Sequence, residues 1–563
     1  MMAGKCVTPS PTGALGRSVA LLVSGLVALG GLSWPAVAQV GPGAIPGGAE
    51  SETRRQLEQL ERQQPRPQQQ GPAVIGPTRP SQDILRPGGP KFRLDRLVFT
   101  DSRFLTKAEL EPLAAGITGR MVDFSDLQKV IAAINALYAQ KNIPTGIATL
   151  PPQEVKNGVV TVKLTEGRLD RMSVTGATRT HTGYILPRVE QKQGEVLDVP
   201  KLARDVTWFN RTNDAQIRAL LQPGTSFGLT DVQIAATEAP LNTLQFFWDN
   251  QGVKSTGRYQ GGTYYRASGP LGIDDRFTFY GTTAAGNLNG NASYNLPFNP
   301  WGGRIGASYT ESAIKVLEGP SAPLDVHGRS QLGAINLSQP VWVDEFWLIS
   351  LNGAQSRGRS QTRLAETPIT DDRSDKSTAG ISISHYGNDH SITVAPTFNY
   401  VKSHSDITDL NRYFDLYSAT VSLLVRLPAN FSVSVNGGGQ YTNERLLPGD
   451  QLFQIGGPTT VRGYPTNAVA GDSGYYISYE LHNNLSEFVK GLDVYGFVDM
   501  GEVFSTFPAR TSLYSAGGGV SYTPRPWITI EGSGGAPWKA VVPEQPKYQV
   551  YFRGVFRPLL LVQ

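Results

Sequence analysis

The chain has 563 residues, a formal net charge of +4 at pH 7 and only 17% charged residues. This weakly basic balance argues against a nucleic-acid-binding protein, and a single cysteine excludes a disulfide framework. The chain is instead rich in glycine (62) and in tyrosine and phenylalanine (22 each).

Residues 1–38 have the pattern of an export signal. Lys5 and Arg17 give a positive start, residues 19–32 are apolar, and residues 36–38 form a small-residue cleavage pattern. A membrane anchor is the alternative, but the apolar stretch is short for one. The only cysteine, Cys6, lies inside this segment, so the exported chain has no thiol.

No later stretch offers the run of about eighteen apolar residues that a membrane-spanning helix needs. A closed β-barrel is the other structure that satisfies every backbone hydrogen-bonding group in lipid. An exported chain with many aromatic-bounded alternating segments therefore remains a candidate membrane protein.

Residues 39–91 are rich in proline, glutamine and glycine, with one helical segment at 50–64 that stops before Pro65. Only Leu57 and Leu60 are apolar in it, so this helix must be surrounded by water. Bulk solvent around a linker helix and the lumen of a wet channel are equally compatible with that pattern. The segment that follows it predicts an extended tether.

Residues 92–167 and 168–240 predict two small α+β units with one element order, β-α-α-β-β, which is an internal repeat. The clearest helix is 124–141, with apolar residues at helical spacing and Ser125 as a plausible N-cap. Small sheets of this kind leave edge strands that can accept an extended peptide.

Residues 241–563 predict a mostly β region of about sixteen antiparallel strands. Residues 421–427 show the pattern clearly, with apolar residues at every second position. The candidate strands include 329–339, 346–356 and 378–386. A soluble sandwich is the alternative, but the export signal, the aromatic strand ends and the strand number favour a transmembrane barrel whose lumen is either open or plugged.

The sequence contains no motif of a hydrolase nucleophile, a zinc protease or a phosphate-binding loop, so we expect no enzyme, no cofactor and no use of ATP. The six histidines are scattered. His385 and His390 flank a turn, where solvated histidines are far more common than a metal site.

A long connection at 444–473 and the strand at 491–502 form the most informative pair. Arg462 lies on a tight tip with Gly463, and the alternation of the strand places Asp499 on the inner face if the other face meets lipid. A guanidinium can bind a carboxylate through two parallel hydrogen bonds, which lysine cannot do. Spacing alone leaves a plain surface-loop role for Arg462 equally open. Water in the lumen would screen such a pair to about 1 kcal/mol.

These residues resemble a known family. The tip Val461, Arg462, Gly463 and Tyr464, and the strand residues Phe497, Asp499 and Gly501, are similar to motifs of outer-membrane transporters of two-partner secretion, the haemolysin and filamentous-haemagglutinin type. Residues 249–252 and 255–257 match the first hairpin of that family. The resemblance covers nearly the whole exported chain. One departure is that residues follow Phe556, where such barrels commonly end on an aromatic residue, so the last strand either ends there or has another register.

The resemblance implies a barrel of sixteen transmembrane strands over 241–563, two polypeptide-transport-associated (POTRA) domains over 92–167 and 168–240, and a plug helix within 39–91. It implies that Arg462 binds Asp499 as a lock, and that the POTRA domains sit in the periplasm. The first would capture an unfolded exoprotein along an edge strand and a helix, through Ile147, Leu150, Leu127 and Ile134.

The implied partners are an exoprotein with an N-terminal two-partner-secretion domain, outer-membrane lipid, periplasmic chaperones and the barrel-assembly machinery, with no nucleic acid. The transporter itself would be a monomer. The alternatives are a passive porin-like channel and an insertase for other barrels.

Overall fold

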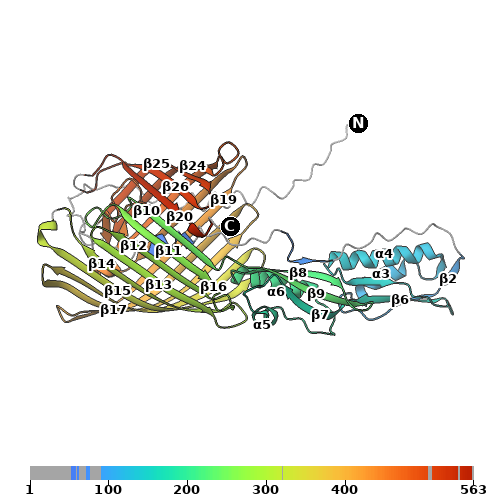
Figure 1. The fold of residues 1–563 in the computed structure, drawn as a ribbon. Helices are drawn as coiled ribbons and strands as arrows, with labels where there is room; N and C mark the ends of the chain where they lie inside the picture. The colour runs from blue at the N-terminus through green and yellow to red at the C-terminus, as the bar shows by residue number, and fades with distance from the viewer. Residues whose placement is uncertain are drawn as a thin grey trace, which may run out of the picture.

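A computed structural model describes residues 52, 54–58, 60–61, 71–76, 90–319, 321–504, 510–542 and 545–560. The predicted export signal and most of the predicted tether lie outside these residues. The molecule is elongated, with a barrel at one end and two small α/β domains in line beyond it (Figure 1).

The first small domain packs two helices on a sheet of order β3-β6-β5. Its helix α4 begins after Asp123, whose carboxylate accepts hydrogen bonds from the Ser125 and Asp126 amides. The N-cap is therefore Asp123 and not Ser125, because Asp123 is the residue with extended backbone before the first turn. The elements are β2 (Phe92–Leu94), β3 (Arg96–Phe99), α3 (Lys107–Ala115), β4 (Arg120–Val122), α4 (Phe124–Gln140), β5 (Gly146–Thr149) and β6 (Val159–Glu166).

The second domain repeats this plan with one addition. Its sheet has the order β1-β8-β9-β7, and β1 (Val74–Ile75) comes from the tether that precedes the first domain. The tether was expected to be extended, but its pairing with a sheet was not predicted. The other elements are β7 (Arg168–Thr175), α5 (Thr182–Ile185), η2 (Leu186–Arg188), α6 (Val199–Thr212), β8 (Gln216–Pro223) and β9 (Leu229–Thr237).

The rest of the chain forms a closed antiparallel barrel, which confirms the predicted sixteen strands. The first strand pairs with the last, so the sheet has no free edge. The strands are β10 (Asn242–Asp249), β11 (Gln260–Ser268), β12 (Arg276–Ala284), β13 (Asn287–Pro297), β14 (Arg304–Lys315), β15 (Val326–Val343), β16 (Trp347–Leu364), β17 (Thr367–Tyr386), β18 (His390–Ser405), β19 (Leu410–Arg426), β20 (Phe431–Tyr441), β23 (Ser473–Asn484), β24 (Leu492–Phe504), β25 (Arg510–Arg525), β26 (Ile528–Pro537) and β27 (Gln549–Phe556).

The barrel wall is apolar outside and polar inside. On β14, Ile305 and Tyr309 are 41% and 48% exposed on the outer face, whereas Thr310 and Ser312 are buried on the inner face. This alternation suits a wall between lipid and water. The last strand ends at Phe556 and is followed by a short 3-10 turn, η5 (Pro558–Leu560).

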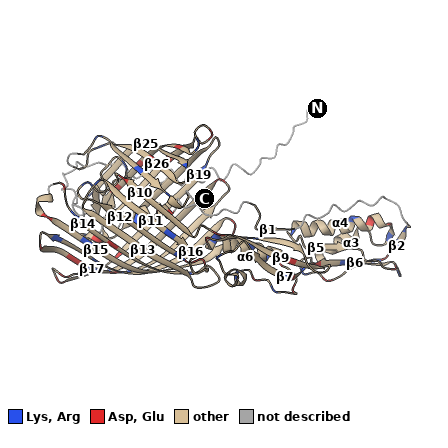
Figure 2. Cartoon of the chain, in the orientation of Figure 1, with Lys and Arg blue, Asp and Glu red and all other residues tan. Residues whose placement is uncertain are grey.

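Strands β15, β16 and β17 extend well beyond the predicted ranges. β15 is longer at both ends. The extensions of β16 and β17 lie at the end of the barrel away from the small domains, where the charged residues of β16 share one face and β17 carries charged residues on both faces (Figure 2). Arg357 pairs with Asp375 at 2.7 Å, and Arg359 pairs with Asp371 at 2.7 Å. Apolar alternation fails there because this part of the wall does not need to meet lipid, so the pattern underestimates strand length.

The second domain is fixed to the barrel by buried charges. Asp214, in the loop before β8, accepts hydrogen bonds from Arg266 at 2.5 Å and from Arg276 at 2.6 Å. Asp274, in the turn between β11 and β12, accepts hydrogen bonds from the Asp214 and Ala215 amides and from Arg304. These contacts tie the domain to three strands at one end of the barrel.

Within the described residues, no helix has both the length and the apolar composition needed to cross a membrane.

Candidate functional site

The connection between β20 and β23 folds back into the barrel. It contains a 3-10 turn, η4 (Gly449–Gln451), and a small hairpin of β21 (Phe453–Ile455) and β22 (Val469–Gly471). Val461, Tyr464 and Val469 are fully buried with Val503 and Leu513 of the wall. The loop is therefore an ordered element with its own apolar contacts, occupying almost the range predicted.

The tip of this loop places Arg462 against Asp499 of β24. The guanidinium donates from Nε to Oδ2 at 2.7 Å and from Nη2 to Oδ1 at 2.7 Å. The backbone amide of Arg462 donates to the same Oδ2 at 2.9 Å. The structure thus brings the two sequence-predicted residues together in the two-bond geometry that only arginine provides.

This pair is buried, whereas the sequence predicted a contact screened by water in the lumen. Arg462 is 6% exposed and Asp499 is fully buried. Because both side chains are buried, the value of about 1 kcal/mol for a screened, exposed pair does not apply. Removing one partner of a buried pair costs about 3–5 kcal/mol because the other charge is left unpaired.

Further groups surround the Arg462 guanidinium. Glu480 accepts from its Nη1 at 2.5 Å, Ser478 accepts from its Nη2 at 2.8 Å, and the Phe497 ring lies 3.5 Å from its central carbon. The stacking gives Phe497 a specific role as a face for the cation. Sequence reasoning missed Ser478 and Glu480, although they occupy alternate positions of β23 and so share one face.

Gly463 allows the tip to reach the wall. Its φ of +87° is strained for any residue with a side chain, and a Cβ there would lie 3.1 Å from the Gly535 carbonyl carbon. Conversely, a Cβ on Gly535 would lie 2.9 Å from the Gly463 nitrogen. Gly501 is similarly confined, since its Cβ would meet Val461 at 3.1 Å.

Tyr464 anchors the tip to the last part of the wall. Its hydroxyl donates to the Tyr514 carbonyl at 3.0 Å, and its own carbonyl accepts from the Tyr551 hydroxyl at 2.8 Å. The four predicted tip residues therefore contact the inner face of strands β24 to β27 together.

The described part of the predicted plug helix, residues 52, 54–58, 60 and 61, is helical and lies inside the barrel. Glu52 accepts from the Thr459 hydroxyl at 2.8 Å, and Arg55 donates to the Gln454 carbonyl at 2.8 Å, which joins the helix to the loop. Gln56 accepts from the Tyr280 hydroxyl, and Leu60 packs on Phe247, Tyr264, Tyr280 and Val555. A helix that is polar nearly all round thus finds polar partners on the inner face of the barrel and on the loop.

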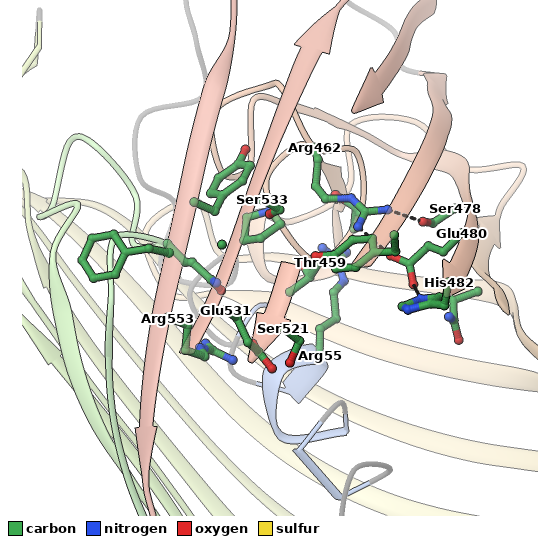
Figure 3. A pocket seen from close by; sticks show the side chains of 18 of the residues that line it. Arg55, Thr459, Arg462, Ser478, Glu480, His482, Ser521, Glu531, Ser533 and Arg553 are labelled. Carbon is green, nitrogen blue, oxygen red and sulfur yellow. Dashed lines mark hydrogen bonds and ion pairs between the residues drawn. The ribbon is translucent and has the colours of Figure 1, made fainter. Parts of the chain in front are cut away.

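A polar cavity of about 530 Å³ lies between the helix, the loop tip and the wall. Figure 3 shows Arg55 and Arg462 entering it from the helix and the loop, with Glu480, His482, Glu531 and Arg553 on the wall side. Both elements that fill the lumen therefore meet the wall beside a polar space.

The first and last strands are joined by a second buried ion pair. Asp249 accepts from Arg553 Nε at 3.0 Å, and both side chains are at most 8% exposed. Asn250 bonds across the same seam: its Nδ2 donates to the Val550 carbonyl at 3.0 Å, and its Oδ1 accepts from the Phe552 amide at 2.9 Å. The first-hairpin motif thus closes the barrel, and Arg553 is the partner that sequence reasoning missed.

In the first domain, β5 is the outer strand of its sheet, and Ile147 on it is 37% exposed. Leu150 follows β5 and is half-buried. Leu127 and Ile134, at 3% and 0% exposed, are buried in the domain core and are not available to a ligand in this conformation. The apolar face of α4 is packed on the sheet, so a role for these two residues in binding stays a prediction.

Within the described ranges, no three His, Cys, Asp or Glu side chains gather closely enough to hold a metal ion. His385 and His390 lie with their rings stacked 5.1 Å apart.

Comparisons with known proteins extend this description. The profile of the haemolysin secretion/activation proteins ShlB/FhaC/HecB matches residues 228–522, more than half of the chain, and the ShlB-type POTRA domain profile matches residues 92–167. The outer membrane transporter CdiB of Dickeya dadantii strain 3937 is 24% identical over 415 residues, which cover 70% of this chain and 73% of that protein. The hemolysin transporter protein ShlB of Serratia marcescens is 21% identical over 404 residues, which cover 68% and 70%.

Among solved structures, CdiB from Escherichia coli superposes with a TM-score of 0.66 at 20% identity, covering 93% of this chain and all of that one. BamA from Haemophilus ducreyi lacking POTRA domains 1–3 gives a TM-score of 0.51 at 13% identity, covering 83% of this chain and all of that one. Both likenesses show a shared fold. The chain therefore belongs to the haemolysin secretion/activation family ShlB/FhaC/HecB and is an outer-membrane β-barrel with periplasmic POTRA domains.

Proposed function

We propose that this chain recognises an unfolded exoprotein in the periplasm through its POTRA domains and secretes it through the barrel without ATP. The observation that carries the proposal is the way in which the lumen is filled. The helix at 52–61 and the loop tip are held by side-chain hydrogen bonds and ion pairs to the wall, and neither is a strand of the barrel sheet. Such contacts can be exchanged for others without opening the sheet.

The helix is the element proposed to leave. It contacts the wall through Gln56 and Leu60 and contacts the loop through Glu52 and Arg55. Few of these contacts are apolar, so a helix moving into water loses little buried hydrophobic area. The polar side chains that cover most of the helix also allow it to remain soluble outside the lumen.

The loop tip is the element proposed to lock. Arg462, Asp499 and Glu480 form a buried charged group in which each acid is satisfied by the same guanidinium. A buried ion pair contributes geometric specificity more than stability. We therefore assign it the role of fixing one position of the loop during assembly and in the closed channel.

Recognition of the exoprotein is assigned to the outer strand β5 of the first POTRA domain. Ile147 lies on the strand that ends this sheet among the described residues, where an extended segment could add by β-augmentation. The exoprotein would carry an N-terminal two-partner-secretion domain, and its folding outside the cell would supply the driving force.

Two other functions each leave part of the molecule unexplained. A passive porin accounts for the barrel but not for two POTRA domains beside it. An insertase shares the fold of the barrel, but the profile that matches more than half of the chain is that of secretion proteins.

Deletion of the gene tests the proposal. We expect one large exoprotein to disappear from the culture medium, and a plasmid copy of the chain to restore it, whereas the set of other outer-membrane barrels should stay unchanged. A medium that keeps every exoprotein contradicts secretion. Loss of several barrels from the membrane indicates an insertase instead.

A further inference from the structure

The outer face of the barrel changes from apolar to charged along β15 and β16. Residues paired across neighbouring strands share a face of the sheet, so the register assigns each position to the outside or the inside. Ile335, Leu337 and Leu351 lie on the outer face and are exposed there. Farther from the POTRA domains, the same face carries Arg329 and Arg359. The part of the wall that suits hydrocarbon therefore ends before these strands do.

Tyrosines mark the boundary between the two parts. Tyr309 of β14, Tyr400 of β18 and Tyr413 of β19 are exposed on the outer face. Aromatic residues form such girdles where a barrel wall passes from hydrocarbon to lipid headgroups. The periplasmic POTRA domains lie at the other end of the barrel (Figure 1), so this girdle faces the headgroups of the outer leaflet.

A hollow of about 700 Å³ opens in the outer wall at this girdle. Its lining includes Tyr309, Gly333, Lys402 and Tyr413, and the register places all four on the outer face. Gly333 lies between Tyr309 on one side and β16 on the other, and a Cβ on it would meet no atom within 4 Å. The glycine therefore leaves open space at the surface of the wall.

Two arginines of the lining turn outward from their acids. Arg359 pairs with Asp371 at 2.7 Å, and the two side chains are 44% and 12% exposed. Arg373 pairs with Asp406 at 2.7 Å, and these side chains are 58% and 22% exposed. In each pair the carboxylate is covered, whereas the guanidinium, with its five N–H donors, reaches the solvent. The hollow thus presents positive groups to its surroundings, at the charged end of the barrel (Figure 2).

Lys402 adds a cation without a counter-charge. Asp375 stands opposite it in the register, but this carboxylate binds Arg357 at 2.7 Å. Within the described part of the chain, no other acid forms an ion pair with Lys402, and its ammonium lies 5.9 Å from the centre of the Tyr400 ring. The positive charge of Lys402 is therefore available to an anion from outside the protein.

We propose that this hollow binds the phosphorylated headgroup of an outer-leaflet lipid. Arg359, Arg373 and Lys402 would bind the phosphate oxygens, because charge-assisted hydrogen bonds from guanidinium and ammonium groups are the strong contacts to phosphate. The acyl chains would lie along Ile335 and Leu337, which continue the same face towards the middle of the wall.

The position of the hollow favours a lipid over free phosphate. The cations are directly continuous with the lipid-facing wall, and only an amphiphile contacts both surfaces. A solvated strand end would need the paired charges, but neither the cation at Lys402 nor the open space above Gly333. This inference does not depend on the proposed secretion function.

Reversal of one charge tests the site. The probe is lipid A with two phosphates, and native mass spectrometry of the full-length protein in detergent measures its dissociation constant. We expect Lys402→Glu to weaken binding at least fivefold, because a carboxylate repels phosphate and no ion pair within the wall is lost. The matched control is Lys376→Glu, the same change on the inner face of β17, where the register partner Val401 is buried. It should stay within twofold of the unchanged chain.

Filling the hollow tests it without a change of charge. Gly333→Phe places a ring in the open space, whereas Gly353→Phe places the same ring on the outer face beside Leu337, away from the cations. We expect at least a fivefold loss of lipid A binding in Gly333→Phe and a change within twofold in Gly353→Phe. Heat-modifiable migration in gels should show a folded barrel in every variant that is compared.

Two further probes identify the ligand. Lipid A without its phosphates should bind the unchanged chain at least fivefold more weakly, and inorganic phosphate alone should not reach the affinity of lipid A. Equal binding of the phosphate-free lipid would overturn phosphate recognition, and equal binding of inorganic phosphate would overturn the lipid as occupant. Unchanged binding of lipid A by both Lys402→Glu and Gly333→Phe would overturn the site itself.

Discussion

Arg462 is the residue at which most of the lumen contacts meet. It binds two carboxylates, one hydroxyl and one aromatic face, and it is almost completely buried. A lysine could supply the charge but not the fork that binds both Asp499 oxygens. The identity of this residue therefore matters more than its charge.

Replacing Arg462 tests whether the arginine side chain holds the loop in place. Arg462→Ala leaves Asp499 buried without a partner and should cost about 3–5 kcal/mol in the stability of the loop position. We expect at least a tenfold loss of secretion, and Arg462→Lys should behave like the alanine variant. The barrel should stay folded, which its heat-modifiable migration in gels would show. Arg357→Ala is the control, since its pair with Asp375 is exposed. Normal secretion by Arg462→Ala would exclude the lock.

Glu238 offers a pH-dependent contact at the end of the second POTRA domain. Burial opposes its ionisation, but hydrogen bonds from the Thr180 amide, the Thr178 hydroxyl and the Arg179 amide lower its pKa from 4.5 to about 2. A carboxylate with a lowered pKa in the folded state stabilises the fold above its unfolded pKa, and this stabilisation is lost as the pH falls from about 4.5 towards 2.

Glu238→Gln should therefore destabilise the domain at pH 7 by about 1 kcal/mol, a value reduced for solvent screening. The difference from the unchanged chain should vanish near pH 2. Thermal unfolding of the detergent-solubilised protein at pH 7, 4 and 2.5 measures it, with the exposed Glu154→Gln as control. A difference that is constant with pH would assign the effect to packing.

At the scale of elements, the sequence was informative wherever one face of a segment is apolar. Helix α4 and several of the barrel strands show that pattern, so their positions could be predicted. It failed for β1, since two residues carry no period. It also underestimated β16 and β17, whose extensions carry charged residues, on both faces in the case of β17.

The site could be predicted in part for the same reason. Asp499 was placed inside by the alternation of β24, and the tip was recognised by its motif. Arg553 is far from Asp249 in sequence, and only the closure of the barrel brings the two together. Glu480 lies on the strand that follows the loop, and the folding of the loop back into the barrel brings Arg462 to it. The burial of the Arg462 pair also depends on the loop folding back against the wall, which no single segment reveals.

The plug helix gives a prediction at this scale. Replacing residues 50–64 by a Gly-Ser segment of equal length removes the contacts of Glu52, Gln56 and Leu60 but keeps the tether length. We expect a severalfold rise in single-channel conductance in planar bilayers, and a similar rise on deleting the segment. A conductance that does not change in either variant would show that these residues do not obstruct the lumen.

In the whole molecule, the placement of the POTRA domains depends on the buried group around Asp214. Its carboxylate faces Arg266 and Arg276 of the barrel, and Arg266 is only 7% exposed. The second domain is thereby held in one orientation against the barrel, and the first domain is carried along with it.

Asp214→Asn should loosen this junction, because Arg266 would remain buried without its counter-charge, at a cost of about 3–5 kcal/mol. Spin labels on α6 and on β14 would report a broader distance distribution in pulsed electron resonance. Asp231→Asn, which removes a solvent-exposed pair with Arg171 in the same domain, should leave the distribution narrow. An equally narrow distribution in both variants would contradict the clamp.

The contact between Gly463 and Gly535 has a consequence for how this molecule can vary. Two backbones meet there with no side chain on either, and each would clash with a methyl group on the other. Because both positions already hold the smallest residue, no compensating change at one can rescue a substitution at the other. A search for correlated substitutions among relatives would miss this contact, however strongly the channel depends on it.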